Sequence, residues 1–254
     1  MPPSVGLVLP AFRPDVDRLA SYVEVIREAV GPDEIRVEVD DPSPETEAAL
    51  AELEVTVNAV PYRRGKGAAV TAGFEALGTD VLAFADADGS TPGASLAAVL
   101  EPVVAGDADL AVGSRRHPAA EVATHQTFAR KHMGDAFAWL ARRLLTVPLY
   151  DYQCGAKAIT ADGWASIREH LYEPGFAWDV ELVAIAGALD LRVREVPIEW
   201  RDAPGSTVSP VRDGFRLARA LFAARHRAKQ LSNSRVHTAI ASRREQPTAL
   251  VEKE

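Results

Sequence analysis

The stretch Val81-Leu82-Ala83-Phe84-Ala85-Asp86-Ala87-Asp88 decides the fold of this chain. Its first five residues form an apolar run, which is typical of a strand buried in a parallel sheet. Asp86 and Asp88 follow at the carboxyl end of that strand, where open α/β sheets bind their ligands. Two carboxylates in such a crevice suit Mg²⁺ or Mn²⁺ held jointly with a diphosphate. An acidic turn that caps the next helix is the alternative.

The composition bounds the class of protein. A chain of 254 residues, 47% apolar and 25% charged, fits one large α/β domain or one domain with an appendage. The net charge of −8 argues against general nucleic-acid binding. The single cysteine, Cys154, suits a reducing cytoplasm. Because no apolar run approaches the roughly 18 residues of a membrane span and the first residues lack signal-peptide features, we expect a soluble body.

Strands and helices alternate along the first half of the chain. The patterns predict strands over residues 5–9, 35–39, 55–57, 81–85 and 110–113, and helices over 15–30, 45–53, 67–77 and 94–104. This alternation predicts an α/β fold with a mostly parallel, Rossmann-like sheet flanked by helices. Further on, helical patterns cover 128–145, 179–189 and 213–229, and residues 193–200 alternate like an edge strand.

We expect the sheet domain to span residues 1–205, a basic amphipathic helix segment to span 206–231, and a polar, disordered tail to span 232–254. From Arg212 to Leu231 there are six Arg and Lys against one Asp, a net charge of +5. Phe215, Leu221 and Phe222 supply an apolar side. Such a helix can lie among the headgroups of an anionic membrane. An ordinary surface helix packed on the domain is the alternative.

Basic and acidic residues occur at three more predicted strand ends. The glycines of Arg63-Arg64-Gly65-Lys66-Gly67 would let the backbone and Lys66 approach a phosphate, unless this is only a solvated turn. Asp40 and Asp41 could bind a nucleobase or ribose, or merely cap a helix. Arg115 and Arg116 could bind a second phosphate, or form structural salt bridges. His117, His125 and His132 are not at metal-ligand spacing with the cysteine.

Taken in order, these pieces resemble glycosyltransferase family 2, whose members have the GT-A fold. Within the family, the chain is most similar to dolichyl-phosphate β-glucosyltransferases and dolichol-phosphate mannose synthases, over roughly residues 5 to 225. The most specific pieces are Gly113-Ser114-Arg115-Arg116, Asp151-Tyr152-Gln153-Cys154-Gly155-Ala156-Lys157, Phe176-Ala177-Trp178-Asp179-Val180-Glu181-Leu182 and Val196-Pro197-Ile198-Glu199-Trp200 before Gly205-Ser206. Gly65-Lys66-Gly67-Ala68-Ala69-Val70 and Asp86-Ala87-Asp88-Gly89 fit the same pattern.

The resemblance implies metal-dependent transfer of a hexose, with inversion, from a donor of the UDP-glucose or GDP-mannose type to a polyprenyl (dolichyl) phosphate. It implies a donor-side set of Pro10, Phe12, Asp40, Asp41, Lys66, Asp86 and Gln153, a metal pair of Asp86 and Asp88, and a catalytic set of Asp88, Asp179, Arg115 and Arg201. Asp40 would contact the base, Arg115 or Arg116 the acceptor phosphate, and Asp179 would lie beside the acceptor. A buried polar role that ties loops together is the alternative for Gln153 and Asp179.

The acceptor phosphate needs no general base, because its second pKa is about 6 and it is mostly deprotonated at neutral pH. Asp179 would therefore position groups rather than remove a proton. One segment departs from the family pattern: Pro10-Ala11-Phe12-Arg13-Pro14 stands where Pro-x-Tyr/Phe-Asn-Glu is usual. The donor's nucleotide and sugar therefore stay open, as do a soluble acceptor and a binding protein without activity. We expect peripheral attachment to the cytoplasmic face of a membrane through the basic helix.

Overall fold

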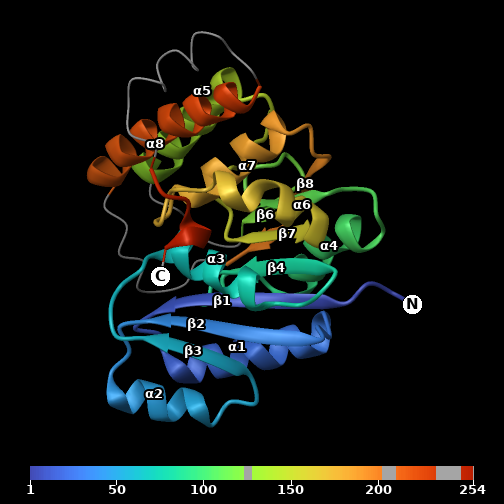
Figure 1. Cartoon of the computed structure of the whole chain (residues 1–254), viewed down its shortest axis with the longest axis vertical. Helices are drawn as coiled ribbons and strands as arrows, with labels where there is room; N and C mark the ends of the chain where they lie inside the picture. Colours follow the sequence, from blue (N-terminus) through green and yellow to red (C-terminus); the bar gives the residue numbers. More distant parts are fainter. Residues whose placement is uncertain (123–127, 202–209, 233–246, 254) are drawn as a thin grey trace.

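The computed structural model describes the backbone of residues 1–122, 128–201, 210–232 and 247–253, and the side chains of 1–121, 134–201, 216–232 and 247–253. A seven-stranded sheet in the order β3-β2-β1-β4-β7-β5-β8 forms its centre (Figure 1). The strands are β1 (Val5–Phe12), β2 (Glu34–Asp40), β3 (Thr56–Val60), β4 (Val81–Ala85), β5 (Leu110–Ser114), β7 (Ala156–Thr160) and β8 (Val193–Pro197). A second sheet pairs β6 (Glu121–Val122) with β9 (Glu199–Trp200).

The sheet is mostly parallel, as the sequence predicts. β7 is the exception, because it runs antiparallel to both β4 and β5. The sequence pattern does not predict this strand. Residues 193–200, predicted as one edge strand, are divided: β8 ends at Pro197, and the backbone N–H of Ile198 bonds the carbonyl of Ser114.

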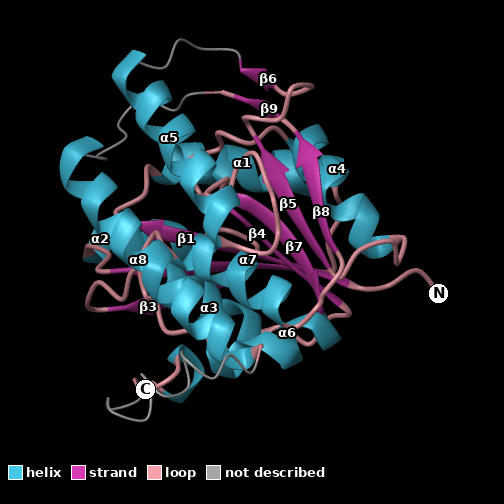
Figure 2. Ribbon diagram, turned by 90° about the horizontal axis from the view of Figure 1, so that it is seen from above, coloured by secondary structure: helices cyan, strands magenta, loops and turns pink. Residues whose placement is uncertain are grey.

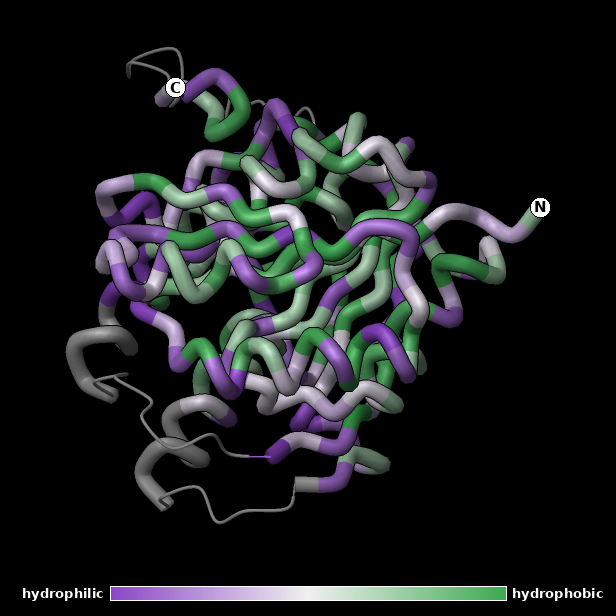
Figure 3. The backbone as a smooth tube through the Cα atoms, turned by 90° about the horizontal axis from the view of Figure 1, so that it is seen from below, coloured by the Kyte–Doolittle hydropathy of each residue, from purple (hydrophilic) through white to green (hydrophobic). Residues whose placement is uncertain are grey.

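Helices cover both faces of the sheet (Figure 2). They are α1 (Val16–Ala29), α2 (Pro44–Ala51), α3 (Lys66–Ala76), α4 (Gly93–Val104), α5 (Phe128–Leu144), α6 (Ala161–Ile167), α7 (Trp178–Ala188) and α8 (Pro210–Leu231), with the 3₁₀ turns η1 (Arg168–His170) and η2 (Leu250–Glu252). α1 and α4 pack against each other, and α5 and α8 lie over α7 as an outer layer. Hydrophobic and hydrophilic segments alternate along several of the helices, as expected where one side of a helix covers a sheet (Figure 3).

The core has two halves, one on each face of the sheet, because neighbouring residues of a strand point to opposite faces. Leu7 and Leu9 of β1 pack with α1 and α4, whereas Val8 packs with Phe74 of α3 and Trp178 of α7. All five residues of β4 are buried. This explains why the run from Val81 to Ala85 is apolar throughout rather than alternating.

Local signals start the helices near the predicted positions. The carboxylate of Asp15 caps α1 through the backbone N–H of Arg18, and the hydroxyl of Ser43 caps α2 through that of Thr46. The described helices that the sequence predicts begin and end within a few residues of their predicted bounds, whereas α6 has no predicted counterpart. No helix among the described residues is long and apolar enough to cross a membrane.

The chain after Ser232 differs from its prediction where it is described. Residues 247–253 are ordered by packing: Leu250 is buried, and its backbone N–H bonds the carbonyl of Leu171. Three apolar residues, Ala-Leu-Val, within a polar stretch are too few to show a hydrophobic periodicity, so the sequence does not predict this contact. The prediction of disorder is wrong for these seven residues; 233–246 and 254, and the predicted boundary at 205, lie outside the described residues.

Candidate active site

Four parallel strands end at one edge of the sheet and bring the predicted residues there. Phe12 and Asp40 end β1 and β2 as register partners, Asp86 follows β4, and Arg115 follows β5. The carboxyl ends of parallel strands share an edge, so residues separated by more than 100 positions are brought to the same edge. The sequence prediction that these strand ends form one site is consistent with this arrangement.

Lys66 is the first residue of α3, and its ammonium links two carboxylates. Its Nζ lies 2.9 Å from Oδ1 of Asp86 and 2.9 Å from Oδ2 of Asp179. The preceding Gly65 has a φ of 98°, a conformation that favours glycine, and its backbone lies against the carbonyl of Pro174. Burial disfavours the ammonium, but the two carboxylates outweigh this effect and raise the pKa of Lys66. Lys66 is therefore a fixed positive charge at the sheet edge.

The Asp86 carboxylate is the accessible partner of Lys66. Its side chain is 39% exposed, and its backbone N–H bonds the carbonyl of Gly155 at 2.8 Å. Burial favours the neutral acid, but the nearby Lys66 ammonium, with Arg115 and Lys157, lowers the pKa of Asp86. Asp86 is ionised at neutral pH and faces the edge of the sheet.

Asp88 is exposed in the turn that follows. Its Oδ1 accepts a hydrogen bond from the backbone N–H of Ser90 at 3.0 Å and another from the Ser90 hydroxyl. Gly89 between them has a φ of 70°. The acidic turn that was the alternative to a metal site is thus present. It leaves the Asp88 side chain exposed, two residues from Asp86.

The residues present fit a divalent cation that is shared with a ligand. Within the described part of the chain, no group of three or more His, Cys, Asp or Glu could hold a metal by itself. The hydrogen bonds that the described residues make to Asp86 and Asp88 side chains all engage Oδ1. Mg²⁺ and similar cations are commonly held by one or two carboxylates together with substrate phosphates. Asp86 and Asp88 could supply that pair of oxygen ligands.

On the predicted base side, Asp40 is buried and orders the loop before α3. Its Oδ1 accepts from Nε of Arg64 at 2.8 Å, and its Oδ2 accepts from the backbone N–H of Gly65 at 2.8 Å. Arg64 also donates to the fully buried Glu38. Asp40 therefore holds the segment that carries Lys66.

The unusual Pro10–Pro14 segment forms an exposed cation–aromatic cluster. Phe12 lies beneath two guanidinium groups, with Cζ of Arg63 4.1 Å and Cζ of Arg13 5.2 Å from the ring centroid. Arg13 also pairs with Asp41 at 2.9 Å, and both residues have positive φ values, 48° and 50°. Pro10 is half-buried within β1. Arginine here thus links the ends of β1 and β2.

On the predicted acceptor side, Arg115 forms a bidentate pair with Asp151. Nε lies 2.7 Å from Oδ2, and Nη2 lies 3.1 Å from Oδ1. Burial tends to raise the pKa of Asp151, but Arg115 outweighs it and lowers the pKa to about 2. The guanidinium also lies 5.7 Å from the ring of Trp200. The structural salt bridge that was the alternative to phosphate binding is therefore present, and it fixes Arg115 beside the carboxyl edge of the sheet.

Three other predicted residues are also held by hydrogen bonds or ion pairs. Arg116 pairs with Asp135 of α5. The backbone N–H of Gln153 donates to Asp151 at 3.0 Å. The backbone N–H of Arg201 bonds the carbonyl of Ser90 at 3.0 Å, which places Arg201 beside the Asp88 turn, while its exposed guanidinium pairs with Glu199. His125, His132, Arg212 and Phe215 have no described side chains.

Asp179 is fully buried, with an exposed fraction of 2%, in the first turn of α7. One oxygen bonds Lys66, and the other bonds Lys157 of β7 at 2.5 Å. This is the arrangement expected of a buried polar residue that ties loops together. No role is predicted for Lys157 from the sequence. A signal was available, because Lys157 is one of only five lysines and stands between apolar residues in Ala156-Lys157-Ala158-Ile159.

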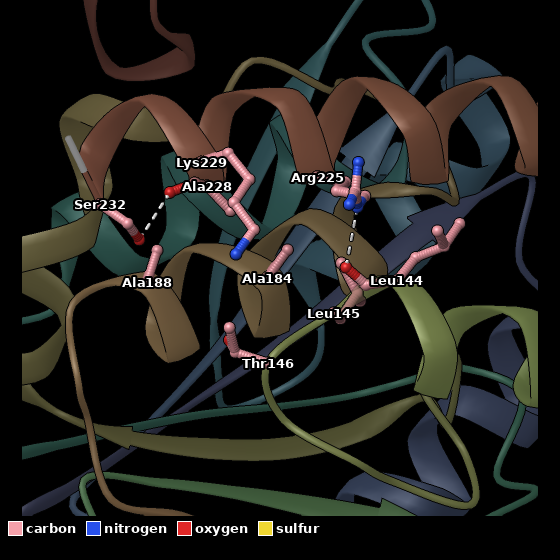
Figure 4. Close-up of a pocket in the computed structure, with 9 residues that line it drawn as sticks. All are labelled: Leu144, Leu145, Thr146, Ala184, Ala188, Arg225, Ala228, Lys229 and Ser232. Carbon is pink, nitrogen blue, oxygen red and sulfur yellow. Dashed lines mark hydrogen bonds between the residues drawn. The ribbon is translucent and has the colours of Figure 1, made fainter. Parts of the chain in front are cut away.

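A small cavity lies elsewhere, in the helical layer of α5, α7 and α8 (Figure 4). Its volume is about 10 Å³, room for about one water molecule. Arg225 Nε bonds the carbonyl of Leu144 at 3.1 Å across it, and the Ser232 hydroxyl bonds the carbonyl of Ala228 at 3.0 Å. This cavity is a packing seam and is too small for a substrate.

The fold and this edge define the class: the chain has the GT-A fold of glycosyltransferases. It belongs to glycosyl transferase family 2, whose model matches residues 7–156. Among solved structures, it is similar to glucosyl-3-phosphoglycerate synthase from Mycobacterium tuberculosis, with a TM-score of 0.67 at 18% identity over 88% of this chain and 80% of the other. That likeness establishes the fold.

The chain also resembles three kinds of curated relatives. It is 30% identical to glycosyltransferase AglD of Haloferax volcanii, over 82% of this chain and 35% of that protein. It is 31% identical to dolichyl-phosphate beta-glucosyltransferase of Drosophila melanogaster, over 63% of this chain and 50% of that protein. It is 30% identical to undecaprenyl-phosphate mannosyltransferase of Micrococcus luteus, over 76% of this chain and 82% of that protein. The chain thus spans about a third of the length of the first of these relatives and half of the length of the second.

Proposed function

We propose that this chain transfers a hexose from a nucleoside-diphosphate sugar to a polyprenyl phosphate, with Mg²⁺ or Mn²⁺ bound at Asp86 and Asp88. The observation that carries the proposal is the ionised Asp86 carboxylate beside the fixed Lys66 ammonium at the carboxyl edge. The names of the dolichyl-phosphate and undecaprenyl-phosphate relatives support the acceptor class.

The reaction forms a bond between an acceptor phosphate oxygen and the anomeric carbon, and breaks the bond from that carbon to the donor diphosphate. A divalent cation would supply positive charge to the departing diphosphate. Lys66 adds a second positive charge at the same edge. The acceptor is already an anion, so no residue has to remove a proton. Attack on the face opposite the leaving group inverts the anomeric centre.

Arg115 and Arg201 are proposed to hold the acceptor phosphate. Two anions must come together during the transfer, and guanidinium groups offset their repulsion. Arg115 is fixed by Asp151, and the backbone of Arg201 is fixed against the Asp88 turn. Phe12, Asp40 and Asp41, with Pro10 behind them, are proposed to form the nucleoside side, and Gln153 to lie between the two substrates.

Attachment to a membrane surface is proposed through α8. Arg216, Arg219 and the 55%-exposed Phe222 lie on this helix, and the 60%-exposed Trp139 lies on α5, which packs against it. Aromatic rings next to cations suit the headgroup region of an anionic bilayer. An enzyme placed there, on the cytoplasmic face, would meet a lipid-linked phosphate and a water-soluble donor together.

A radioactive-sugar assay tests this function. The protein is incubated with labelled UDP-glucose or GDP-mannose, Mn²⁺ and a polyprenyl phosphate in detergent, and label is counted in the organic and aqueous phases. The proposal predicts lipid-soluble label that depends on the lipid. Label transferred only to water-soluble products would indicate a soluble acceptor. Calorimetric binding of the donor without any transfer would indicate a binding protein without activity.

A further inference from the structure

Lys157 lies deep in the sheet, directly behind the proposed site. It is on β7, opposite Phe84 of β4, and Phe84 precedes Asp86 by two residues. The side chain is 1% exposed. Its ammonium donates to the carbonyl of Cys154 at 2.8 Å and to Oδ1 of Asp179 at 2.5 Å. A lysine is seldom buried so completely unless its charge is paired.

The four charged residues alternate in sign from the interior to the edge. Lys157 bonds Asp179, Asp179 bonds Lys66, and Lys66 bonds Asp86. Both ammonium groups lie near the ring of Phe84, at 5.0 Å for Lys66 and 5.6 Å for Lys157. The two oxygens of Asp179 are thus divided, with one on each lysine.

This division fixes the position of the Lys66 ammonium. With Oδ1 engaged by Lys157, Asp179 offers Oδ2 to Lys66, and Lys66 keeps its contact with Asp86. Without Lys157, Oδ1 of the buried Asp179 carboxylate has no cation of its own, and the carboxylate can turn both oxygens towards Lys66. The Lys66 ammonium would then lose its shared position between Asp179 and Asp86.

We propose that Lys157 is a positioning residue, which orients the Asp179 carboxylate and through it holds Lys66 against Asp86 where a donor diphosphate binds. The choice of a donor diphosphate as the ligand rests on the proposed function. The arrangement of the four charges is independent of that function. Lys157 touches neither substrate. Its effect therefore passes entirely through Asp179 and should disappear when Asp179 cannot transmit it.

Calorimetric titration with UDP and with GDP, each with Mn²⁺, tests this dependence. The variants are Lys157→Met, Asp179→Asn and the double variant Lys157→Met/Asp179→Asn. The double variant removes one positive and one negative charge together, so it can fold even if a single variant, with an unpaired buried charge, does not. Lys253→Met removes an exposed lysine far along the chain and is the matched control. We expect each single variant to weaken diphosphate binding roughly tenfold, as loss of an outer-shell partner typically does.

We expect the double variant to have a diphosphate affinity no lower than that of whichever single variant binds less tightly. The reason is that the effects of two residues do not add when one acts only through the other. Unchanged diphosphate affinity in folded Lys157→Met, or losses that multiply in the double variant, would show that Lys157 only stabilises the fold. Loss of melting temperature alone does not support the proposal, since a merely structural lysine would also cause it.

A crystal structure of Lys157→Met gives a readout that needs no nucleotide. We expect Lys66 Nζ to lose hydrogen-bond contact with Asp86 or with Asp179; retention of both contacts at their present distances overturns the inference. If the wild-type protein binds neither UDP nor GDP, the proposed function fails, and this structure still decides the role of Lys157.

Discussion

Asp86 lies directly against Gly155, so that a Cβ atom added to Gly155 would come within 1.9 Å of Asp86 Oδ2. The two residues are also joined by the hydrogen bond from the Asp86 backbone N–H to the Gly155 carbonyl. Gly155 stands just before β7, and Asp86 just after β4. The antiparallel pairing of these strands therefore places the carboxylate and gives a reason for glycine at this position.

Replacing Gly155 by alanine should displace the Asp86 carboxylate. We expect at least a roughly tenfold fall in sugar transfer, because a misplaced reacting group is costly even when the chemistry is intact. The rate of lipid-linked sugar formation measures the effect. Gly78→Ala is the matched control, because nothing lies within 4 Å of its added Cβ. Equal rates for the two variants would contradict the proposed place of Asp86 in the site.

The Arg115–Asp151 pair should make stability depend on acid pH. Because the folded pKa of Asp151 is about 2, below its ordinary 3.8, the ionised carboxylate stabilises the fold above about pH 4. That contribution is lost as the pH falls through 2. It amounts to about 2 kcal/mol, from about 1.4 kcal/mol per pKa unit.

Urea unfolding of wild type and Asp151→Asn at several pH values measures this contribution. The difference in free energy of unfolding between the two should shrink by about 2 kcal/mol from about pH 5 to about pH 2. A difference that stays constant over this range would show that Asp151 is not held ionised by Arg115. Asp162→Asn, at the amino end of α6, is a carboxylate control without such a partner arginine among the described residues.

Glu181 should depend on Arg227 for its burial. The Glu181 carboxylate is buried in α7, accepts from the backbone N–H groups of Tyr172 and Glu173 at 2.8 Å each, and pairs with Arg227 of α8. Arg227→Leu should cost about 1–3 kcal/mol of unfolding free energy, because a buried charge loses its partner. Chemical denaturation measures it, with the exposed Arg219→Leu as control. Adding Glu181→Gln should recover part of the loss; a larger loss in the double variant would contradict the pairing.

Binding to vesicles should depend on anionic lipid and on the cations of α8. Replacing both Arg216 and Arg219 by glutamate should weaken the affinity for phosphatidylserine vesicles, measured by co-sedimentation, by roughly a hundredfold or more. Each basic residue contributes about 1 kcal/mol of attraction, and each glutamate adds repulsion from the anionic surface. Binding to neutral phosphatidylcholine vesicles should be weak for both proteins. Equal binding of the two proteins to anionic vesicles would show that α8 is not the attachment surface.

The apolar runs and caps predicted the sheet up to β5 because each strand there is either wholly apolar or clearly bounded. β7 was not predicted, because Ala156-Lys157-Ala158-Ile159-Thr160 is neither wholly apolar nor clearly bounded. Its lysine is buried because it pairs with a carboxylate 22 positions away. The packing of Leu250 against Leu171 likewise leaves no local pattern.

The predicted site residues divide in the same way. The strand ends after β1, β2, β4 and β5 could be read from the sequence, since parallel strands share an edge. Their partners could not. Nothing near Lys66 in the sequence indicates Asp179, 113 positions on, and nothing near Arg115 indicates Asp151, 36 positions on. Such pairs depend on how the helices and β7 pack, which is a property of the whole fold.

The most direct test removes both edge carboxylates. In a correctly folded Asp86→Ala/Asp88→Ala variant, the initial rate of lipid-linked sugar formation from labelled donor, Mn²⁺ and polyprenyl phosphate should fall by about a hundredfold or more. Circular dichroism and the melting temperature should confirm the fold. Glycolipid synthesis at the wild-type rate would contradict the assignment of Asp86 and Asp88 to the reaction.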